Sequence, residues 1–340
     1  MKKFPLARVA VFSAILGIFA AAFPLRSFGA DEAQWRIGYL YTIDPQASGA
    51  SFNNIADILI DNKHNEVLVL DNGNSRVVIT DTHGTFLFQF SFTDAGIKGW
   101  PRSIAVGDDD VIYVAGEEVI TVVRYNGTYV KDLDLSSIPG ADGIAVKSIA
   151  VKGGNLYIGD GGKQKRVIVM DRKKEKFIAQ YSEGLGNNVR LALDSSGFYV
   201  MDPATFGVLR FDEDGKYLGR FGRISGLAGG FSQMSDIYID KKNGRVVIVD
   251  YNRVAVIFFN RNGDFLFEFG GPSMFKMPTV AAVDDFNKVY VADSNMIRVF
   301  KIEEERFEEP KVDVEPESKP EPEPGPEPES KPAPEAPAGP

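Results

Sequence analysis

The sequence contains no cysteine. Disulfide bonds, thiolate metal sites, c-type haem attachment and a lipoprotein anchor are therefore excluded. Histidine is almost as scarce, since the chain has only His64 and His83. Catalytic zinc usually takes three protein ligands, so we do not expect zinc chemistry. The Gly-x-Ser-x-Gly pattern of serine hydrolases is also absent from the sequence.

Basic residues, 38 in number, are outnumbered by 47 acidic ones, and the formal net charge is -9. From residue 303 onward the chain carries 13 acidic and 4 basic residues, so most of the acidity belongs to the C-terminal segment. The remainder is close to neutral. Because nucleic-acid-binding domains carry a large basic surface, we expect no nucleic-acid partner.

The longest apolar run, residues 9–23, follows the basic start Met1-Lys2-Lys3 and ends before Pro24. It is shorter than the ~20 residues that a membrane-spanning helix needs. We interpret residues 1–29 as a signal peptide, with small residues before a cleavage site at Ala30; an uncleaved anchor is the open alternative. Cleavage would leave a periplasmic or extracellular protein that is not integral to the membrane.

Residues 303–340, in contrast, contain few apolar side chains. Of the last 31 residues, 11 are proline and most others are charged. Proline donates no backbone hydrogen bond, and the segment has almost nothing apolar to bury. We predict a disordered acidic tail. It could be a solvated end without a partner, a spacer through the envelope, or a ligand for a basic partner.

Between these ends, residues 30–302 contain six copies of one pattern of four short strands. The second strand of each copy ends at an equivalent position, which recurs every 42 to 48 residues: Asp71, Gly116, Asp160, Asp202, Asp250 and Asp293. Pairs such as Asn126-Gly127 and Asn262-Gly263 suit the tight hairpins between strands. A period of ~40–50 residues with four strands per unit is typical of a β-propeller.

The sixth copy lacks a clear fourth strand, whereas an orphan strand at residues 35–41 precedes the first copy. We therefore predict that this N-terminal strand completes the last blade and closes the ring, which removes exposed sheet edges. The expected fold is all-β: a six-bladed β-propeller of four-stranded antiparallel blades, closed by an N-terminal strand, with a disordered C-terminal tail.

Several copies resemble the NHL repeat. The segments that carry the resemblance are Val289–Phe300, Phe265–Gly271, Met277–Asp284 and Asp71–Val77. The resemblance covers residues 35–302 and implies a six-bladed propeller; the second copy departs from it, with Gly116 in place of the usual Asp. Propellers of this type mostly bind proteins, RNA or glycans, a minority are lyases, and related ones include lactonases. It thus implies the fold better than the function.

Charged residues recur around the second turn of several copies. We expect Asp–Arg pairs that tie neighbouring strands, and these are Asp71 with Arg76, Asp160 with Arg166, Asp250 with Arg253, and Asp293 with Arg298. The run Asp108-Asp109-Asp110 is expected to be a solvated turn. The basic residues between 163 and 176 are expected either to lie on a solvent-exposed edge of a blade or to form a patch that binds an anionic partner.

Residues at the start of each first strand should ring one mouth of the central channel. By alignment these are Asp57, Ser103, Ser148, Arg190, Asp236 and Val280. Two acids and one base could hold a ligand or an ion, and oxygen ligands would suit Ca²⁺. A channel-mouth hydrolase, lactonase or lyase-like enzyme that uses a divalent cation is thus the alternative function. Arg190 and Asp236 could instead simply pair; otherwise we expect no cofactor and no metal.

Two loops that join successive blades are candidate contact surfaces. Residues 221–231 are rich in glycine and include Arg223, and residues 270–277 include Met274 and Phe275, which we expect to be exposed. Both loops should lie on one face of the propeller. We therefore predict an exported, monomeric binding scaffold that presents these loops to a protein or glycan partner in the cell envelope, rather than an enzyme.

Overall fold

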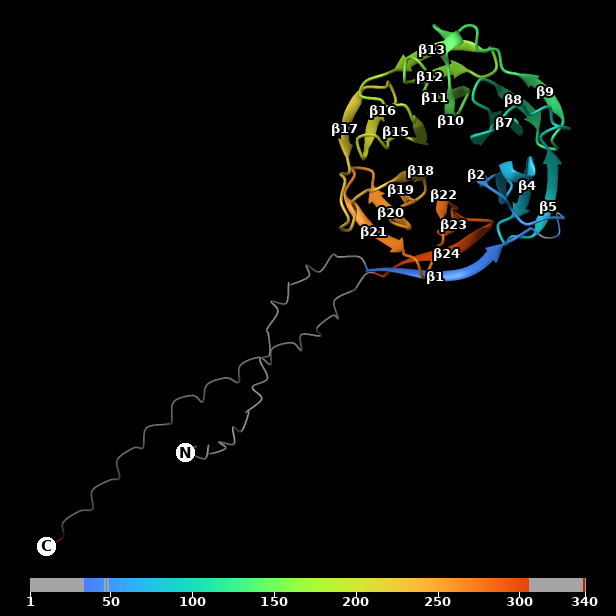
Figure 1. Ribbon diagram of the computed structural model, residues 1–340. Coiled ribbons are helices and arrows are strands. Elements are labelled where there is room, and N and C mark those ends of the chain that lie inside the picture. Colours follow the sequence, from blue (N-terminus) through green and yellow to red (C-terminus); the bar gives the residue numbers. More distant parts are fainter. Residues whose placement is uncertain (1–33, 46, 48, 306–338, 340) are drawn as a thin grey trace, which may run out of the picture. The chain divides into compact units, whose positions relative to one another are not determined.

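The computed structural model describes residues 34–45, 47, 49–305 and 339. The predicted signal peptide, residues 1–29, and almost all of the predicted tail lie outside the described residues. Residues 34–305 form an all-β unit in which six four-stranded antiparallel sheets surround a central axis (Figure 1). The prediction of a six-bladed propeller is confirmed.

Each blade runs from an innermost strand at the axis to an outermost strand at the rim. Blades 1 to 3 consist of β2 (Ile55–Asp61), β3 (Glu66–Asp71), β4 (Arg76–Asp81) and β5 (Phe86–Ser91); β6 (Ser103–Val106), β7 (Val111–Ala115), β8 (Ile120–Arg124) and β9 (Tyr129–Asp132); and β10 (Val146–Lys152), β11 (Asn155–Asp160), β12 (Arg166–Asp171) and β13 (Lys176–Tyr181). Blades 4 to 6 consist of β14 (Arg190–Asp194), β15 (Gly197–Asp202), β16 (Gly207–Asp212) and β17 (Tyr217–Phe221); β18 (Met234–Asp240), β19 (Arg245–Asp250), β20 (Ala255–Asn260) and β21 (Phe265–Gly270); and β22 (Pro278–Val283), β23 (Lys288–Asp293), β24 (Met296–Glu305) and β1 (Gln34–Ile43).

The chain closes its own ring. β1 pairs antiparallel with β24, from Gln34 opposite Glu305 to Ile43 opposite Ile297 (Figure 1). The closure by an N-terminal strand is therefore confirmed. β24 continues three residues beyond the expected boundary at residue 302, and Arg36 lies opposite Glu303. Oppositely charged residues facing each other across two strands favour such pairing, which explains why the acidic start of the tail can remain strand.

The hydrophobic core lies between the blades. One cluster, for example, joins Ile58 and Val69 of blade 1 to Tyr290 and Val299 of blade 6. The β-branched and aromatic residues of the three inner strands supply these contacts, as their preference for a pleated, half-buried surface predicts. Because each blade buries both of its faces against neighbours, the ring holds the inner strands in fixed positions around the channel.

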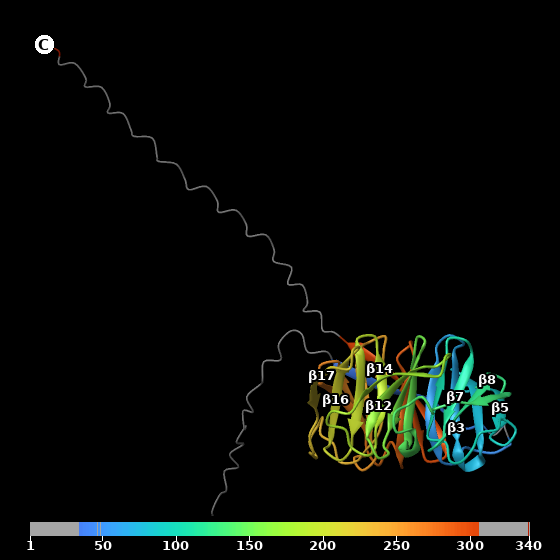
Figure 2. The same cartoon turned by 90° about the horizontal axis from the view of Figure 1, so that it is seen from above.

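Strand directions alternate within each blade, so the connections separate onto two faces, seen edge-on in Figure 2. One face, here called the turn face, carries first-to-second and third-to-fourth connections of only two or four residues. The other, here called the loop face, carries the second-to-third turns and the longer loops between blades. These interblade loops are residues 44–54, 92–102, 133–145, 182–189, 222–233 and 271–277.

Three of the four predicted Asp–Arg pairs are confirmed. The Arg Nε to Asp Oδ2 distance is 2.8 Å for Arg76–Asp71, 3.0 Å for Arg166–Asp160 and 2.8 Å for Arg298–Asp293. The fourth prediction, Asp250 with Arg253, is wrong for the side chains. Arg253 instead forms a two-pronged ion pair with Glu268 on β21, because the guanidinium points outward across the sheet.

The aspartates of these turns also hold the interblade loops. Asp71 accepts a hydrogen bond from the backbone of Asn53, and Asp160 accepts one from Ala145. In the same way Asp250 accepts from Ser232 and Gln233, and Asp293 accepts from Lys276 and Met277. In these four blades a buried carboxylate therefore fixes the interblade loop that leads into its own blade.

Candidate functional site

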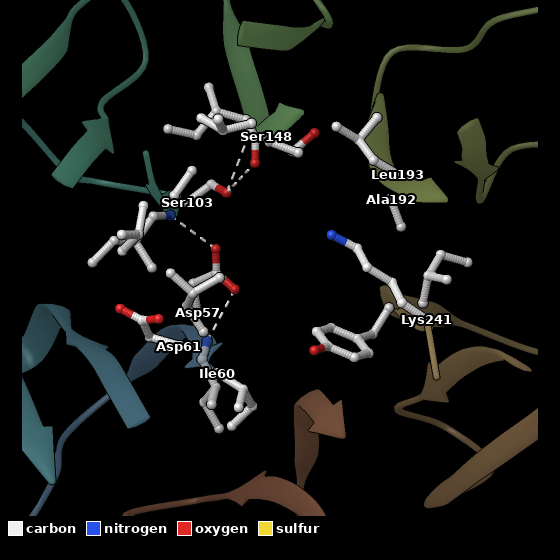
Figure 3. Close-up of a pocket in the computed structure, with 18 of the residues that line it drawn as sticks. Asp57, Ile60, Asp61, Ser103, Ser148, Ala192, Leu193 and Lys241 are labelled. Atoms are coloured by element: carbon white, nitrogen blue, oxygen red, sulfur yellow. Dashed lines mark hydrogen bonds between the residues drawn. The ribbon is translucent and has the colours of Figure 1, made fainter. Parts of the chain in front are cut away.

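The inner strands of all six blades enclose a channel cavity of about 460 Å³ (Figure 3). The structure brings together five of the residues that the sequence alignment selected, and all five line this cavity: Asp57, Ser103, Ser148, Arg190 and Asp236. The sixth aligned position, Val280, is buried in the core between blades 1 and 6. These residues lie at or near the start of the first strand of their blades, and most of their surface is hidden.

Four of these side chains tie their blade to the next one. The backbone N–H of Ile104 donates to Asp57 Oδ2 (3.0 Å), and that of Ile149 donates to Ser103 Oγ (3.3 Å). Two equivalent bonds, from Leu191 to Ser148 Oγ (3.1 Å) and from Ala281 to Asp236 Oδ2 (3.2 Å), continue the series around the ring. These groups are thus satisfied within the protein and stabilise the ring.

Arg190 occupies the fourth position of this series and crosses the end of the channel. Its Nη1 lies 3.0 Å from Asp236 Oδ1 and donates to the carbonyl of Ser235 at 2.9 Å. Its Nη2 donates to the carbonyls of Ala56 and Arg102, each at 3.4 Å. The expected Arg190–Asp236 pair is confirmed, and one guanidinium connects blade 4 with blades 1, 2 and 5.

Burial raises the pKa of two carboxyls that line the channel, Asp57 and Asp236. For Asp57, desolvation outweighs the attraction of Arg190 and the backbone hydrogen bonds. For Asp236, desolvation and the nearby Asp57 raise the pKa to about 7, against the opposing effect of Arg190. Because both carboxyls are desolvated and depend on the charge of one guanidinium, they cannot both ionise without cost. Arg190 therefore already supplies the positive charge that an added cation would bring.

Other charged side chains also line the channel, among them Asp61, Asp108 and Asp285, together with a lysine that the sequence reasoning missed. Leu59, Val106 and Leu193 contribute to the walls, and Lys241 reaches toward the centre from the turn between β18 and β19 (Figure 3). Lys241 is exposed at this opening, yet desolvation by the channel walls lowers the pKa of its ammonium group. The channel is thus lined by both apolar and charged side chains, and no cluster of three metal-ligating side chains occurs in the described part of the chain.

The predicted contact loops both lie on the loop face, but their exposed residues differ from those expected. Arg223 is exposed, whereas Met274 is only half-buried. The prediction that Phe275 is exposed is wrong, because its side chain is 1% exposed. Its ring packs against Phe269 and Phe300 with centroids 5.9 and 5.4 Å away, so Phe275 anchors the loop instead of offering it to a partner.

The loop face exposes four large apolar side chains that the sequence reasoning did not single out. Trp100 is 54% exposed, Ile224 68%, Leu227 71% and Met277 46%, and all four lie in interblade loops. Their sequence signal is a bulky apolar residue inside a loop rich in glycine, proline or serine. On the turn face, Phe286 is exposed but lies beneath the ammonium group of Lys242.

Two charge predictions on blades 2 and 3 are corrected. The turn at Asp108–Asp110 is not merely solvated, since Asp108 and Asp109 form ion pairs with Arg172, whose side chain is fully buried. Arg166 is buried as well. The remaining exposed lysines lie at opposite ends of β12, with Lys163 on the loop face and Lys174 on the turn face. The basic run therefore does not form one patch for an anionic partner.

The comparisons with known proteins agree with this architecture. A family model described as a 6-bladed beta-propeller matches residues 185–307, about a third of the chain. Among solved structures, the WD40 β-propeller domain of Doa1 matches with a TM-score of 0.53 at 14% identity, covering 78% of this chain and 97% of that one. At this identity the likeness shows the fold alone.

No curated protein matches the sequence significantly. The NHL-type character of the repeats stays a prediction. In the described residues, no helix is long and apolar enough to cross a membrane.

Proposed function

We propose that this protein is an exported binding scaffold whose loop face docks onto a protein or glycan partner in the cell envelope. The observation that carries the proposal is the asymmetry of the two faces. The loop face exposes Trp100, Ile224, Leu227 and Met277 on interblade loops, whereas the turn face consists of short turns. Aromatic residues and methionine are enriched in interface cores, so the loop face has the composition of a contact surface.

The loops are also held in place before any partner arrives. Phe231 is completely buried beneath the 222–233 loop, and its backbone bonds to Arg223 and Ser225 close the loop on itself. Asp250 fixes the end of the same loop through Ser232 and Gln233. A preorganised loop loses little conformational entropy on binding, which leaves more of the contact energy for affinity.

The N-terminal pattern at residues 1–29 supports export, and the acidic proline-rich segment supports a spacer that gives the propeller reach. A channel enzyme that uses a divalent cation is less well supported. The charge of Arg190 acts on both Asp57 and Asp236, and its Nη1 lies 3.0 Å from Asp236 Oδ1. A calcium ion would have to displace that guanidinium.

The proposal is tested by comparing capture from an envelope extract with matched variants of the mature protein. The double variant Ile224→Asp/Leu227→Asp places two charges on the loop face, and we expect it to lose at least ten-fold of the specifically captured partner. The control is Leu218→Asp, because Leu218 is 51% exposed on the rim strand β17, away from both faces. Equal capture by all three proteins would contradict the proposal.

A further inference from the structure

A second cavity, of about 230 Å³, opens on the loop face next to Trp100 and is here called the Trp100 cavity. Arg190 lines both this cavity and the channel. The residues that matter for its chemistry are Asn72, Trp100, Arg102 and Lys147. Trp100 also belongs to the exposed apolar side chains of the loop face, whereas none of these four residues lies in the 222–233 loop that carries Ile224 and Leu227.

Asn72 leaves one acceptor unused inside this cavity. Its side chain is buried, at 2% exposure, and its Nδ2 donates to the carbonyl of Pro101 at 2.6 Å. Its Oδ1 is buried and accepts no hydrogen bond from the described part of the chain. An unsatisfied buried acceptor costs ~1–3 kcal/mol. Because Oδ1 has almost no accessible surface, a ligand hydroxyl reaches it only when the side chain turns toward the cavity, and that hydrogen bond would then remove the cost.

Trp100 supplies a flat apolar surface at the same cavity. The other tryptophan of the sequence, Trp35, stacks on Phe267 with a centroid distance of 4.6 Å. Trp100, by contrast, is more than half exposed. The face of an aromatic ring is electron-rich and attracts groups with a positive edge, including the C–H bonds on one side of a sugar ring. A single exposed indole above a small polar cavity thus fits one hydroxylated ring.

The charges around the cavity favour an acidic sugar over a neutral one. Lys147 Nζ lies 3.1 Å from Glu117 Oε1, and Arg102 Nη2 lies 3.8 Å from Glu117 Oε2. Two cationic side chains therefore share one carboxylate, which leaves one positive charge in excess. A carboxylate on the ligand would restore the balance and accept charge-assisted hydrogen bonds from the lysine and arginine.

We propose that the Trp100 cavity binds a uronic acid unit of an acidic polysaccharide. In this arrangement the sugar ring stacks on Trp100 and its carboxylate contacts Lys147 and Arg102, while a turn of the Asn72 side chain lets one sugar hydroxyl donate to Oδ1. A protein partner fits less well here, because an interface anchor prefers a dry apolar pocket and this cavity is small and polar. The inference rests on the proposed role of the loop face and names the ligand class that this face recognises.

The test uses the full mature chain and three uronic acid oligosaccharides: a galacturonate trimer, an alginate trimer and a hyaluronan tetrasaccharide. In a Trp35→Phe background the fluorescence comes from Trp100, and we expect at least one oligosaccharide to change it saturably, while neutral maltotriose does not. Binding should weaken with added salt. Failure of all three acidic probes would overturn the proposal.

Variants measured by calorimetry then locate the site. With the oligosaccharide that binds, we expect Trp100→Ala and Asn72→Ala each to weaken binding at least ten-fold, whereas Trp100→Phe, which keeps a ring, loses less. Lys147→Met should reduce the preference for acidic over neutral sugars. Lys98→Met is the matched control. Lys98 lies on the same loop as Trp100 and pairs with Asp132 of β9, but it does not line the cavity.

The outcomes also separate this inference from the proposed function. If Ile224→Asp/Leu227→Asp abolishes partner capture while no uronic acid oligosaccharide binds, the loop face docks a protein and the sugar proposal is wrong. Unchanged sugar binding by Trp100→Ala or Asn72→Ala, in variants that melt like the parent protein, would equally overturn it.

Discussion

At the scale of single residues, the equivalent channel positions of the blades carry different side chains, yet each of these side chains links its blade to another. Asp57, Ser103, Ser148 and Asp236 each accept a hydrogen bond from the backbone of the following blade. Arg190, in the same column, instead donates to carbonyls and pairs with Asp236. The sequence pattern was sufficient to locate these residues, because register places them at equivalent depth in every blade.

The raised pKa of Asp236 predicts a specific pH dependence of stability. Its pKa is about 7 in the folded protein and near 3.8 in the unfolded chain. Between these values the folded state holds a proton that the unfolded state has released, so the free energy of unfolding falls as the pH rises from about 4 to 7. Asp236→Asn remains neutral and should lack this loss, becoming more stable than the parent at pH 8 by roughly 2–4 kcal/mol.

Denaturant unfolding at pH 5, 6, 7 and 8 measures this difference. At pH 5 the two proteins should be close in stability, because asparagine resembles the protonated acid in size. A variant that loses stability relative to the parent at pH 8 would mean that the ionised Asp236–Arg190 pair is favourable in the fold, contrary to the account.

Exposure of individual loop residues could not be predicted from the sequence. Met274 and Phe275 stand in a loop beside Gly271, and nothing local distinguishes them from Met277. The structure buries Phe275 against Phe269 and Phe300, which come from other parts of the chain. Burial of this kind depends on tertiary contacts, so a list of loop residues identifies the surface but not its contact atoms.

At the scale of elements, each outer strand contains a β-bulge at an equivalent place. The register shift leaves one aliphatic residue per blade without a partner on the neighbouring strand: Leu40, Leu87, Val130, Ile178, Leu218 and Leu266. Bulges interrupt the regular row of backbone groups on a free edge and so discourage edge-to-edge association. An aromatic residue followed by an aliphatic one marks this place in the sequence of all six strands, but the shift in register is not visible there.

The closing strand is the element on which the ring depends. A chain that lacks residues 30–43 would leave β24 as an uncovered edge and would expose the core around Ile297 and Val299. We expect its melting temperature to fall by about 10 °C or more, since 1 kcal/mol shifts the melting temperature of a domain of this size by ~2–4 °C. Differential scanning calorimetry and light scattering measure the loss and the accompanying aggregation.

The control for this experiment is a chain that ends at Glu305 and so keeps the complete ring of strands. It should melt like the full mature chain. If the protein without residues 30–43 also melted like the full chain and remained monomeric, β1 would not be required for closure.

At the scale of the whole molecule, the period of the repeats was enough to predict six blades and their closure. Strand content, hairpin signals and the spacing of Asp71, Asp160, Asp250 and Asp293 all agreed on one architecture, and such agreement between levels marks a well-specified fold. The contact surface was harder to predict. Ile224 and Leu227 become informative only once the structure shows that the 222–233 loop projects them outward and buries Phe231 beneath.

The asymmetry between the loop face and the turn face is the property from which the proposed function follows. The most direct measurement is photo-crosslinking of the mature protein in an envelope extract, with p-benzoylphenylalanine placed in turn at residues 227, 218 and 286. These positions lie on the loop face, on the rim and on the turn face, and all three native side chains are at least half exposed. If the loop face docks the partner, we expect a discrete adduct from position 227 and none from positions 218 and 286. An adduct formed from position 286 or 218 but not from 227 would contradict it.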